Sequence, residues 1–469
     1  MEPFLPHLGR VLMVLGLSIG CVAHGCVAQH LSLNGEAAYG SKLPFSYANT
    51  VHKNVYNAAE WCDKQGQLDD SCLRNALAKA RLKTPSRVLL PRGLYIFGNN
   101  VTVTGLANIE IAGTGASTII QRDGTAFQCY SCTDITLHDI AFTSATIPIK
   151  KLISELPTAD PNQIIVIDRF NSGWGYIPTV NDTDLIVANG CSKHCLSATQ
   201  LAASFDNGVY FRGGSNIEIF GLRGKFYSIS ADSVTAISIH NNVGRNGGKS
   251  NKGGCVTVGS GSERVRVSDN NFSYCSNAGY VYRGANTVIH TRNIAMYNGE
   301  SGHKIGQNAS LHVTHFTSSS NISAYNWFDG YDYSEDYPHT GTTVCHCTSH
   351  DDVAYSNRGV GFYLDGAYWS ISAALVHDNA KDGINAALSH SSITDSVIYG
   401  NNTLRRRGTH QVTIQPGDGV SFVNNTISDN GNGEYGVYAV NPINQIYRGN
   451  TVKGAQTWNG HSGTAISPF

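Results

Sequence analysis

Charged residues are scarce in this chain of 469 residues. They make up 14% of it, against about 25% in an average globular domain. The 33 Lys and Arg residues nearly cancel the 34 Asp and Glu residues, so the basic excess typical of a protein that binds nucleic acid is missing. Only 3 residues are Met, and runs rich in Leu, Glu and Lys are few, which argues against a bundle of long helices. The low net charge together with 41% hydrophobic residues argues against disorder.

Long hydrophobic runs are also missing beyond the N-terminus. One apolar run covers residues 11–20 and follows Arg10, which is the pattern of a signal peptide and is too short to span a membrane. We therefore expect a signal peptide over residues 1–28, with the mature chain starting near Gln29. A lipid anchor at Cys21 is the alternative, although the residues before it fit that signal poorly. The expected protein is secreted or periplasmic, without a membrane span.

Cysteine remains in an even number once the signal peptide is removed. Without Cys21 and Cys26, ten of the 12 cysteines are left, and an even number in an exported protein indicates disulfides. The candidate pairs close in sequence are Cys62 with Cys72, Cys129 with Cys132, and Cys191 with Cys195. Half a zinc site is the alternative for the last pair, but no second ligand pair has matching spacing. Cys255 and Cys275 lie about one repeat apart and are expected to face each other, bonded or stacked.

Glycine is abundant, and it marks a repeat. From about residue 235 onward, an alternating apolar strand, an Asn/Asp-rich turn, a Gly and a second alternating strand recur every 22 to 31 residues. Alternation with period 2 indicates strands, and a repeat of this size indicates stacked units that bury each other. Asn at the turns suits a left-handed backbone and stacking from coil to coil. The register glycines are Gly254, Gly279, Gly302, Gly330, Gly361, Gly383 and Gly436, with two coils between the last two.

The glycine register predicts which side chains point inward. Positions one and three after each Gly are mostly apolar, so we expect them to face the core and positions two and four to face outward. At Gly302 this places His303 in the core, as a histidine with satisfied hydrogen bonds. The pattern predicts a parallel β-solenoid with three short strands per coil, stacked roughly 4.8 Å apart.

Residues 55–145 carry a different signature. Asp69 and Asp70 precede a helical stretch over residues 71–81, and the segments RVLLPRGLYIFGNNVTV and ANIEIAGTGASTIIQRDG follow. This region resembles the N-terminal region of the pectate-lyase-like superfamily of right-handed parallel β-helix proteins. The resemblance implies an all-β, right-handed parallel β-helix with a short N-terminal capping helix. It leaves function open, because the superfamily holds lyases, hydrolases, epimerases and non-enzymes.

One long segment interrupts the repeat. We expect residues 29–469 to form a single β-helix domain with an inserted loop region at about 146–215. Long loops on a rigid scaffold commonly build binding sites. Trp174 and Tyr176 in this insertion are candidates for stacking on sugar rings, and packing of the loop against the solenoid is the equal alternative.

The outward positions of the second strand supply the candidate catalytic residues. Because charged residues are scarce, their clustering on one stripe is informative. A stripe over about five coils is long enough for several sugar units, with an ordinary solvated face as the alternative. This outward stripe consists of the catalytic candidates Arg283, Lys304, Asp332, Tyr363 and Asp365, together with Asn385 as a candidate for substrate binding.

Several mechanisms fit the outward stripe. A lyase or epimerase acting on a uronic acid needs a base, such as Lys304 or Tyr363, and a cation such as Arg283 to stabilise the developing charge. An inverting glycosidase needs two carboxyls about 6.5–9.5 Å apart. Asp332 and Asp365 differ by one coil and two residues, which places their Cα atoms about 8 Å apart. Spacing alone therefore permits both chemistries.

The segment WFDGYDYSEDYPHTG is the densest run of polar and aromatic residues. Trp327 and His339 are candidates for substrate binding, and Asp329 with its acidic neighbours for calcium, with a solvated loop as the alternative. The run Asp336 to His339 resembles the Asp-Pro-His motif of mannuronan epimerases, but the inserted Tyr337 breaks it. No cofactor is certain, and calcium is the one candidate.

The leading hypothesis is a secreted polysaccharide-active enzyme, favoured as a lyase on a uronic-acid-containing polymer. An inverting glycoside hydrolase and a uronan epimerase are the enzymatic alternatives. A non-catalytic carbohydrate-binding or periplasmic β-helix protein is the alternative from another class. The expected partner is a polysaccharide, not nucleic acid, and the sequence does not give the oligomeric state.

Overall fold

A computed structural model describes residues 54–122, 124–143, 175–178, 184–187, 207–225, 227–245, 247, 254–275, 277–305, 313–334, 344–405, 408–428, 435–440 and 443–453. The chain divides into two units, residues 1–44 and 45–469, and every described residue belongs to the second. The expected signal peptide, the Cys191 and Cys195 pair, Trp174 and His339 lie outside the described residues.

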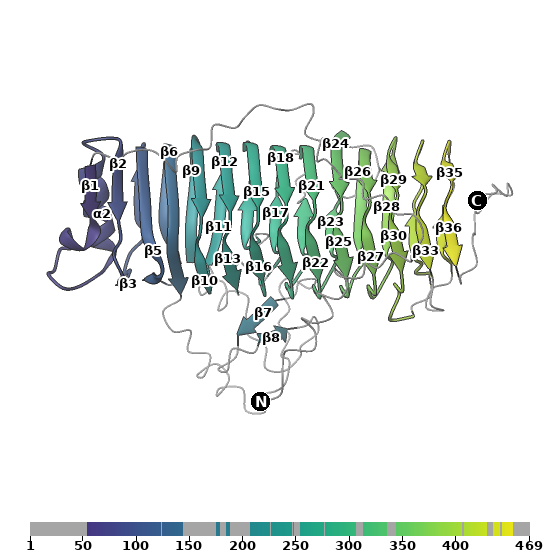
Figure 1. Cartoon of the computed structure of the whole chain (residues 1–469), viewed down its shortest axis with the longest axis horizontal. Coiled ribbons are helices and arrows are strands. Elements are labelled where there is room, and N and C mark those ends of the chain that lie inside the picture. Colours follow the sequence, from purple (N-terminus) through teal and green to yellow (C-terminus); the bar gives the residue numbers. More distant parts are fainter. Residues whose placement is uncertain are drawn as a thin grey trace, which may run out of the picture. The chain divides into compact units, whose positions relative to one another are not determined.

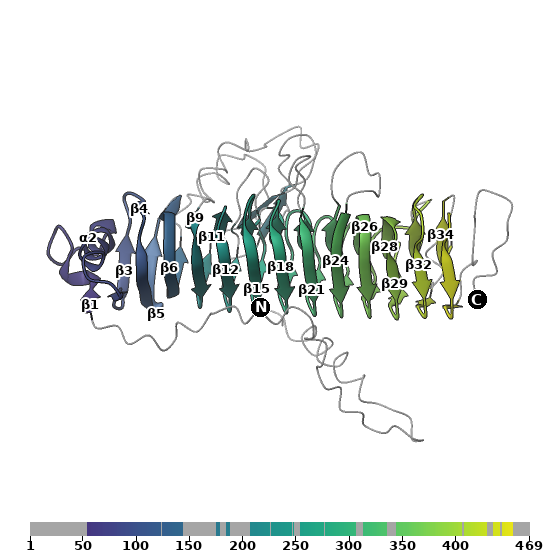
Figure 2. The same cartoon turned by 90° about the horizontal axis from the view of Figure 1, so that it is seen from above.

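The described strands form three columns, each built by parallel pairing of one coil with the next (Figures 1 and 2). The first column contains β4 (Val101–Thr104), β11 (Tyr227–Asp232), β14 (Val256–Val258), β17 (Tyr280–Tyr282), β20 (His303–Ile305), β23 (Tyr331–Tyr333), β28 (Ile384–Ser389), β31 (Val412–Ile414) and β34 (Val437–Ala439), with the first parts of β6 (Thr125–Thr143), β9 (Asn207–Phe220) and β26 (Phe362–Ser372).

The second column contains β1 (Asn54–Asn57), β2 (Ser86–Leu89), β12 (Thr235–His240), β15 (Glu263–Ser268), β18 (Asn286–Thr291), β21 (Thr314–Ser319), β24 (Val344–His350), β29 (Ser392–Thr394), β32 (Ser421–Val423) and β35 (Ile446–Arg448), with the first part of β5 (Ala107–Gln121) and later parts of β6, β9 and β26. The third contains β3 (Gly93–Ile96), β10 (Arg223–Lys225), β13 (Val243–Arg245), β16 (Asn271–Ser273), β19 (Ile294–Met296), β22 (Ile322–Ala324), β25 (Val353–Tyr355), β27 (Leu375–His377), β30 (Val397–Tyr399), β33 (Thr426–Ser428) and β36 (Thr451–Lys453), with the ends of β5 and β6. The predicted coil of three short strands is confirmed.

The N-terminal end of the solenoid is covered by α2 (Asp70–Ala80), which follows the short 3₁₀ helix η2 (Ala58–Glu60). Asp69 caps α2 by accepting a hydrogen bond from the Ser71 N–H, which satisfies one of the donors exposed at a helix start. Its buried face includes Leu73, Ala76 and Leu77, spaced as one side of a helix. The helix expected over residues 71–81 is confirmed.

Four disulfides lie among the described residues: Cys62–Cys72, Cys129–Cys132, Cys255–Cys275 and Cys345–Cys347. The first two confirm pairs expected from their closeness in the sequence, and the third shows that the facing cysteines are bonded. No described helix is long and apolar enough to cross a membrane.

The core follows the glycine register. The side chains one position after Gly279, Gly302, Gly330 and Gly361 are fully buried. Their rings form a continuous stack along the first column, with centroid distances of 5.1 Å, 4.7 Å and 4.3 Å between successive rings. The stacked residues are Tyr280, His303, Tyr331 and Phe362. The gap between Gly383 and Gly436 does contain two coils, because Val412 pairs with both Ile384 and Val437.

The register is wrong at one glycine. Val256, expected outward, is buried and pairs with Tyr280, whereas Thr257, expected inward, is only partly buried. The coil is offset by one residue at Gly254, so Cys255 takes the place that glycine holds in the next coil, and its Sγ bonds to Cys275 inside. A shift of one residue exchanges the two faces of a strand.

The solenoid also resumes earlier than expected after the insertion. Strand β6 ends at Thr143, and its neighbour β9 begins at Asn207, within the segment 146–215. Inside that segment, β7 (Gly175–Pro178) pairs antiparallel with β8 (Asp184–Val187). Tyr176 belongs to β7, but its side chain lies outside the described part.

Candidate functional site

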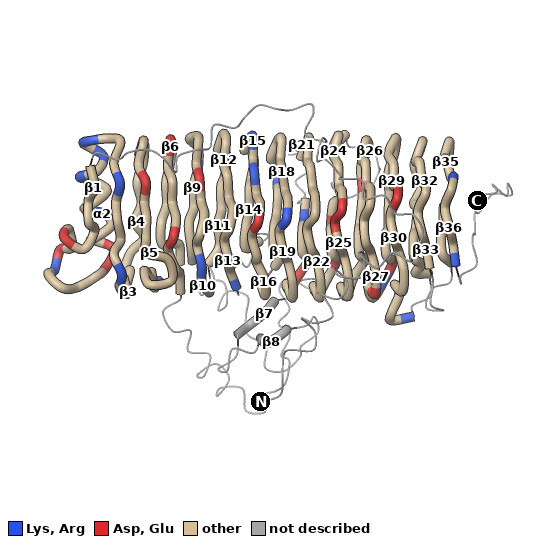
Figure 3. Tube along the Cα trace, viewed as in Figure 1, with Lys and Arg blue, Asp and Glu red and all other residues tan. Residues whose placement is uncertain are grey.

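The first column brings four residues of the outward stripe onto neighbouring strands. Lys304 on β20 pairs with Asp332 on β23, Asp332 pairs with Tyr363 on β26, and Tyr363 pairs with Asn385 on β28. Each lies two positions after a register glycine or its equivalent, so successive side chains follow each other from coil to coil. Charged residues are scattered over many coils of the solenoid (Figure 3), and what distinguishes these four residues is that each lies directly opposite the next in the paired strands.

Lys304 is held between two carboxylates. Its Nζ lies 2.8 Å from Asp332 Oδ2 and 2.5 Å from Glu300 Oε1. Burial opposes the charge on the amine, but Asp332 and Glu300 together raise the pKa of Lys304 above its usual range. The amine therefore keeps its proton at neutral pH, which suits charge stabilisation and not the role of base.

Asp332 and Asp365 are far more enclosed than expected for outward residues. Their exposed fractions are 8% and 1%. Asp332 Oδ1 accepts a hydrogen bond of 2.5 Å from Ser334 Oγ, while its other oxygen faces Lys304. Because each carboxylate is covered by its neighbours, we expect its loss to cost more stability than an ordinary surface change.

Asp329 is a carboxyl of different character. It is buried, and its Oδ1 accepts a hydrogen bond of 2.6 Å from the Val360 N–H in the next coil. Burial and the charge of Asp332 raise the pKa of Asp329 to about 7, against the opposing effects of that N–H, Lys381 and Lys304. Asp329 therefore holds its proton to a much higher pH than an ordinary carboxyl does. The alternative of a solvated loop acid is wrong for this residue.

Tyr363 lies in the field of three carboxyls. Burial raises its pKa to about 12, and Asp365, Asp332 and Asp329 add to the effect. The phenol is consequently a hydrogen-bond donor at neutral pH. Since Asp332 lies opposite Tyr363 in the observed register, Asp365 sits one coil and two residues from Asp332, which keeps the separation of about 8 Å between their Cα atoms.

Arg283 is only weakly connected to the other residues of the outward stripe. It lies on the coil before Lys304, where its N–H donates to Val258 O. Burial lowers the pKa of its guanidinium, while Glu300 and Asp232 act against that shift. Arg283 is thus near Glu300, but three coils separate it from Asp365.

At the other end of the outward stripe, Asn385 is positioned by Asp382. The Asn385 amide donates a hydrogen bond of 3.1 Å to Asp382 Oδ2. Burial raises the pKa of Asp382 to about 6, although the His410 N–H donates to its other oxygen at 2.6 Å. Asp329 and Asp382 have the same local arrangement. Each directly precedes a register glycine and accepts a hydrogen bond from a backbone N–H of the next coil.

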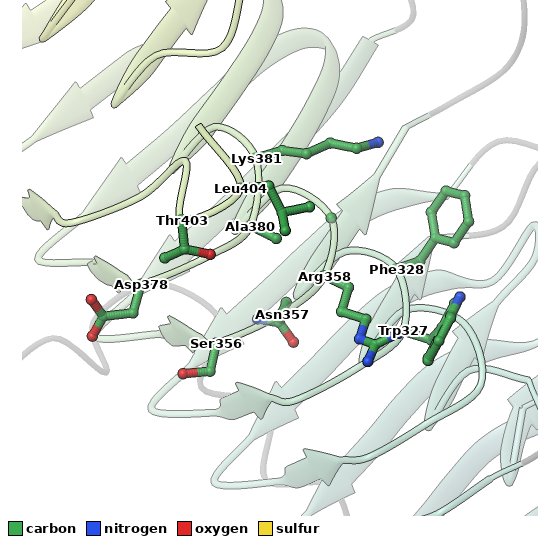
Figure 4. Close-up of a pocket in the computed structure, with 11 residues that line it drawn as sticks. Trp327, Phe328, Ser356, Asn357, Arg358, Asp378, Ala380, Lys381, Thr403 and Leu404 are labelled. Carbon is green, nitrogen blue, oxygen red and sulfur yellow. The ribbon is translucent and has the colours of Figure 1, made fainter. Parts of the chain in front are cut away.

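A pocket of about 760 Å³ opens beside these residues (Figure 4). Trp327, one of the expected substrate-binding residues, lines it, with the Arg358 guanidinium 3.7 Å from the centre of the indole ring. Lys381 Nζ lies 5.7 Å from the centre of the Phe328 ring. Trp327 therefore belongs to a cationic pocket and packs against an arginine.

Sequence reasoning missed Glu300, Asp382, Arg358 and Lys381, and gave Asp329 no catalytic role. The signal for Asp329 and Asp382 was their shared place before a register glycine. Among the described residues, no group of three or more His, Cys, Asp or Glu side chains is arranged to hold a metal. The calcium expectation also involved Glu335 and Asp336, which lie outside the described residues.

Comparison with known proteins adds information on the fold. No protein-family model matches the sequence, and no curated protein sequence matches it. Among solved structures, the A-module of mannuronan C-5 epimerase AlgE4 from Azotobacter vinelandii aligns over 88% of this chain and 100% of its own, with 14% identity and a TM-score of 0.53. The receptor-binding tailspike of bacteriophage Det7 aligns over 89% of this chain and 78% of its own, with 12% identity and a TM-score of 0.55. These likenesses, at 12–14% identity, concern the fold alone, and they confirm the right-handed parallel β-helix that the sequence predicted.

Proposed function

We propose that this protein is a polysaccharide-active enzyme, and that hydrolysis by a pair of carboxyl groups is the reaction its site supports best. The observation that carries the proposal is the contrast between Asp329 and Asp332. Asp329 has a pKa raised to about 7, whereas Asp332 is ion-paired to Lys304 at 2.8 Å. Two carboxyls whose environments differ in this way are suited to act as acid and base.

In this mechanism Asp329 donates a proton to the oxygen of the leaving sugar. Asp332, held by the Lys304 cation, takes a proton from the attacking water as the general base. Asp365 and Tyr363 complete the polar lining, and Asn385 and Trp327 contribute to binding the chain of sugars. The likeness in fold to a mannuronan epimerase supports a glycan as the substrate.

The lyase favoured from the sequence needs a different base. Lys304 and Tyr363 were the candidates, and both keep their protons at neutral pH because their pKa values are raised. This favours hydrolysis over proton abstraction next to a carboxylate. Lyase and epimerase chemistry on a uronic-acid polymer remain the alternatives that the assay below separates.

The test is a panel of purified polysaccharides, neutral and acidic, incubated with the mature protein. We expect new reducing ends without ultraviolet absorbance, because hydrolysis creates no double bond. Equal growth of absorbance and reducing ends would indicate a lyase and contradict the proposal. Retained glycan binding with neither signal would indicate a binding protein or, if the sugar composition changes, an epimerase.

The second part of the test concerns the carboxyls. Asp332→Asn is expected to lower kcat by about 10²–10⁴, as loss of a catalytic base does. Asp395→Asn is the control, because Asp395 is an exposed carboxylate on another part of the solenoid. Full activity of Asp332→Asn would remove Asp332 from the catalytic residues.

The disulfides, which are typical of oxidising compartments, also support the proposed secreted or periplasmic location.

A further inference from the structure

The pocket beside Trp327 lies along one edge of the strands that carry the carboxyls. Trp327 and Phe328 come just before β23, which holds Asp332. Residues 356–359 come just before β26, and residues 378–381 just before β28. The pocket and the outward stripe are therefore built from the same coils.

Small residues in the middle coils make the pocket hollow. The Gly359 N–H donates to Phe328 O, and the Lys381 N–H donates to Gly359 O, so these three residues form one row across the coils. Gly359 carries no side chain between Phe328 and Lys381, and Asp329 Oδ1 occupies the place that its Cβ would take. In the adjoining row, the short side chain of Ala380 follows Arg358, and Thr403 and Leu404 close the far side.

The pocket carries positive charge next to an acidic site. Arg358 and Lys381 line it. Asp378 also lines it, and one of its carboxylate oxygens lies 2.8 Å from His377 Nδ1. Lys381 also lowers the pKa of Asp329, so its field reaches the carboxyl that is proposed as the acid. Glu300, Asp329 and Asp332 would repel an anionic substrate, and these two cations lie where they offset that repulsion.

We propose that this pocket binds the anionic group of a sugar residue, a carboxylate or a sulfate ester, in the polysaccharide that the enzyme cleaves. The inference deepens the proposed function and rests on it for the cleavage step alone. The Arg358 guanidinium lies 3.7 Å from the centre of the Trp327 ring. A guanidinium can stack on a ring with its face and bind oxyanions along its edge, so the two contacts are compatible. The Lys381 amine supplies the second charge.

Calorimetric binding of three tetrasaccharides tests this inference: an oligogalacturonate, a sulfated carrageenan fragment and a neutral galactan fragment. The Asp332→Asn protein serves as the background, so that the sugars stay intact, and circular dichroism verifies its fold. We expect one anionic sugar to bind at least tenfold more tightly than the neutral one. The anionic probe that binds then distinguishes carboxylate from sulfate.

Substitutions then identify the cations. Lys381→Met and Arg358→Gln are each expected to weaken binding of the anionic sugar about tenfold or more, the effect of losing a charged hydrogen bond. Lys83→Met, an exposed cation next to the N-terminal helix, is the control and should change nothing. The inference would be overturned if the neutral sugar bound as tightly as the anionic ones, or if none of the three sugars bound. It would also be overturned if neither substitution changed the affinity for the anionic sugar.

Failure of this inference is distinguishable from failure of the proposed function. Reducing-end release from the corresponding polymers is measured with the otherwise wild-type protein and with its Lys381→Met and Arg358→Gln variants. Cleavage that is insensitive to both substitutions would keep the hydrolase and overturn the pocket. Charge-dependent binding without cleavage would keep the pocket and remove the hydrolase.

Discussion

At the scale of single residues, a buried hydrogen-bond chain fixes the protonation of two histidines. His303 Nε2 lies 3.2 Å from Ile322 O, an acceptor only, so this nitrogen carries the proton. His303 Nδ1 then accepts from His290 Nε2 at 2.7 Å. His290 Nδ1 in turn accepts from Tyr282 Oη at 2.6 Å and from the Asn293 amide at 3.1 Å. Both rings are neutral, and neither has a site for another proton.

The hydrogen-bond chain through His303 predicts that the stability of the folded protein is sensitive to acid. Burial lowers the pKa of His303 to about 3. Below about pH 6.5, His303 therefore binds a proton in the unfolded state but not in the folded state. The stability due to neutral His303 is present above pH 6.5 and is lost as pH falls toward 3, at up to about 1.4 kcal/mol per pH unit. In His303→Phe this loss is absent.

Urea unfolding of both proteins between pH 7 and pH 4 checks the prediction. His303→Phe is expected to be less stable at pH 7 by about 1–3 kcal/mol, because the His290 N–H loses its acceptor. The difference should shrink as the pH falls. A difference that stays constant over the whole range would show that His303 titrates normally.

A second residue-scale prediction concerns Gly359. A Cβ at this position would lie 2.1 Å from Asp329 Oδ1 and 2.7 Å from the Phe328 carbonyl carbon. Gly359→Ala therefore displaces the proposed catalytic acid, and we expect activity to fall by roughly 10²-fold, the effect of a misplacement of about 1 Å. Gly98→Ala is the control, since its nearest contact would be an ordinary 3.7 Å. Equal activity of both variants in the reducing-end assay would argue against a role for Asp329.

At the scale of elements, asparagine ladders hold successive turns together. In one ladder, the backbone N–H of each Asn donates to the side-chain oxygen of the ladder residue in the next coil. The side-chain amide of each Asn also donates to a backbone carbonyl of the solenoid. The ladder consists of Asn242, Asn270, Asn293, Asn321 and Asp352. The left-handed backbone lies at the preceding residue, such as Asn241 or Arg292, and not at the ladder asparagine. The stacking expected from the sequence is therefore present, but it does not require a left-handed backbone at those positions.

Asp352 is the acidic end of this ladder and predicts a stabilising substitution. Burial raises its pKa to about 6, despite hydrogen bonds from Ser349, Ser318 and Asn321. The folded protein therefore favours the protonated carboxyl, and this contribution is lost as pH rises from about 4 through 6. Asp352→Asn keeps the accepting oxygen without the charge. We expect it to be more stable than the wild type by on the order of 1–3 kcal/mol at pH 8, and this gain to vanish below pH 4.

Thermal unfolding at both pH values gives the comparison. Asp351→Asn is the matched control, because Asp351 is the exposed neighbour and its loss should leave stability nearly unchanged. Destabilisation of Asp352→Asn at pH 8 would show that the ladder needs the carboxylate.

At the scale of the whole molecule, repetition made the fold predictable. The glycine register placed His303, Tyr331 and Phe362 in the core because every coil repeats the same alternation. The register was wrong at Gly254, where the coil is offset by one residue before β14. Such an offset can be recognised only when the paired strand is known. The outward positions of Lys304 and Asp332 were predictable for the same reason as the core.

Their environments were not predictable from the repeat. Burial and the charge of Asp332 raise the pKa of Asp329, whereas the Val360 N–H and Lys381, which come from the following coils, act against that shift. The pocket likewise joins Trp327, Arg358 and Lys381 across three coils, and no local pattern marks such a set. Burial and charge at a site depend on neighbours that alternation does not specify.

The most direct test of the central claim, that Asp329 acts as acid and Asp332 as base, is the pH dependence of kcat/KM on the best polysaccharide of the panel. A general acid must be protonated, so the rate should fall as pH rises through the pKa of Asp329, about 7. Asp329→Asn, measured alongside, should lose this alkaline limb together with about 10²–10⁴ of the rate. A profile that stays flat to pH 9, or an Asp329→Asn protein with full activity, would contradict the account.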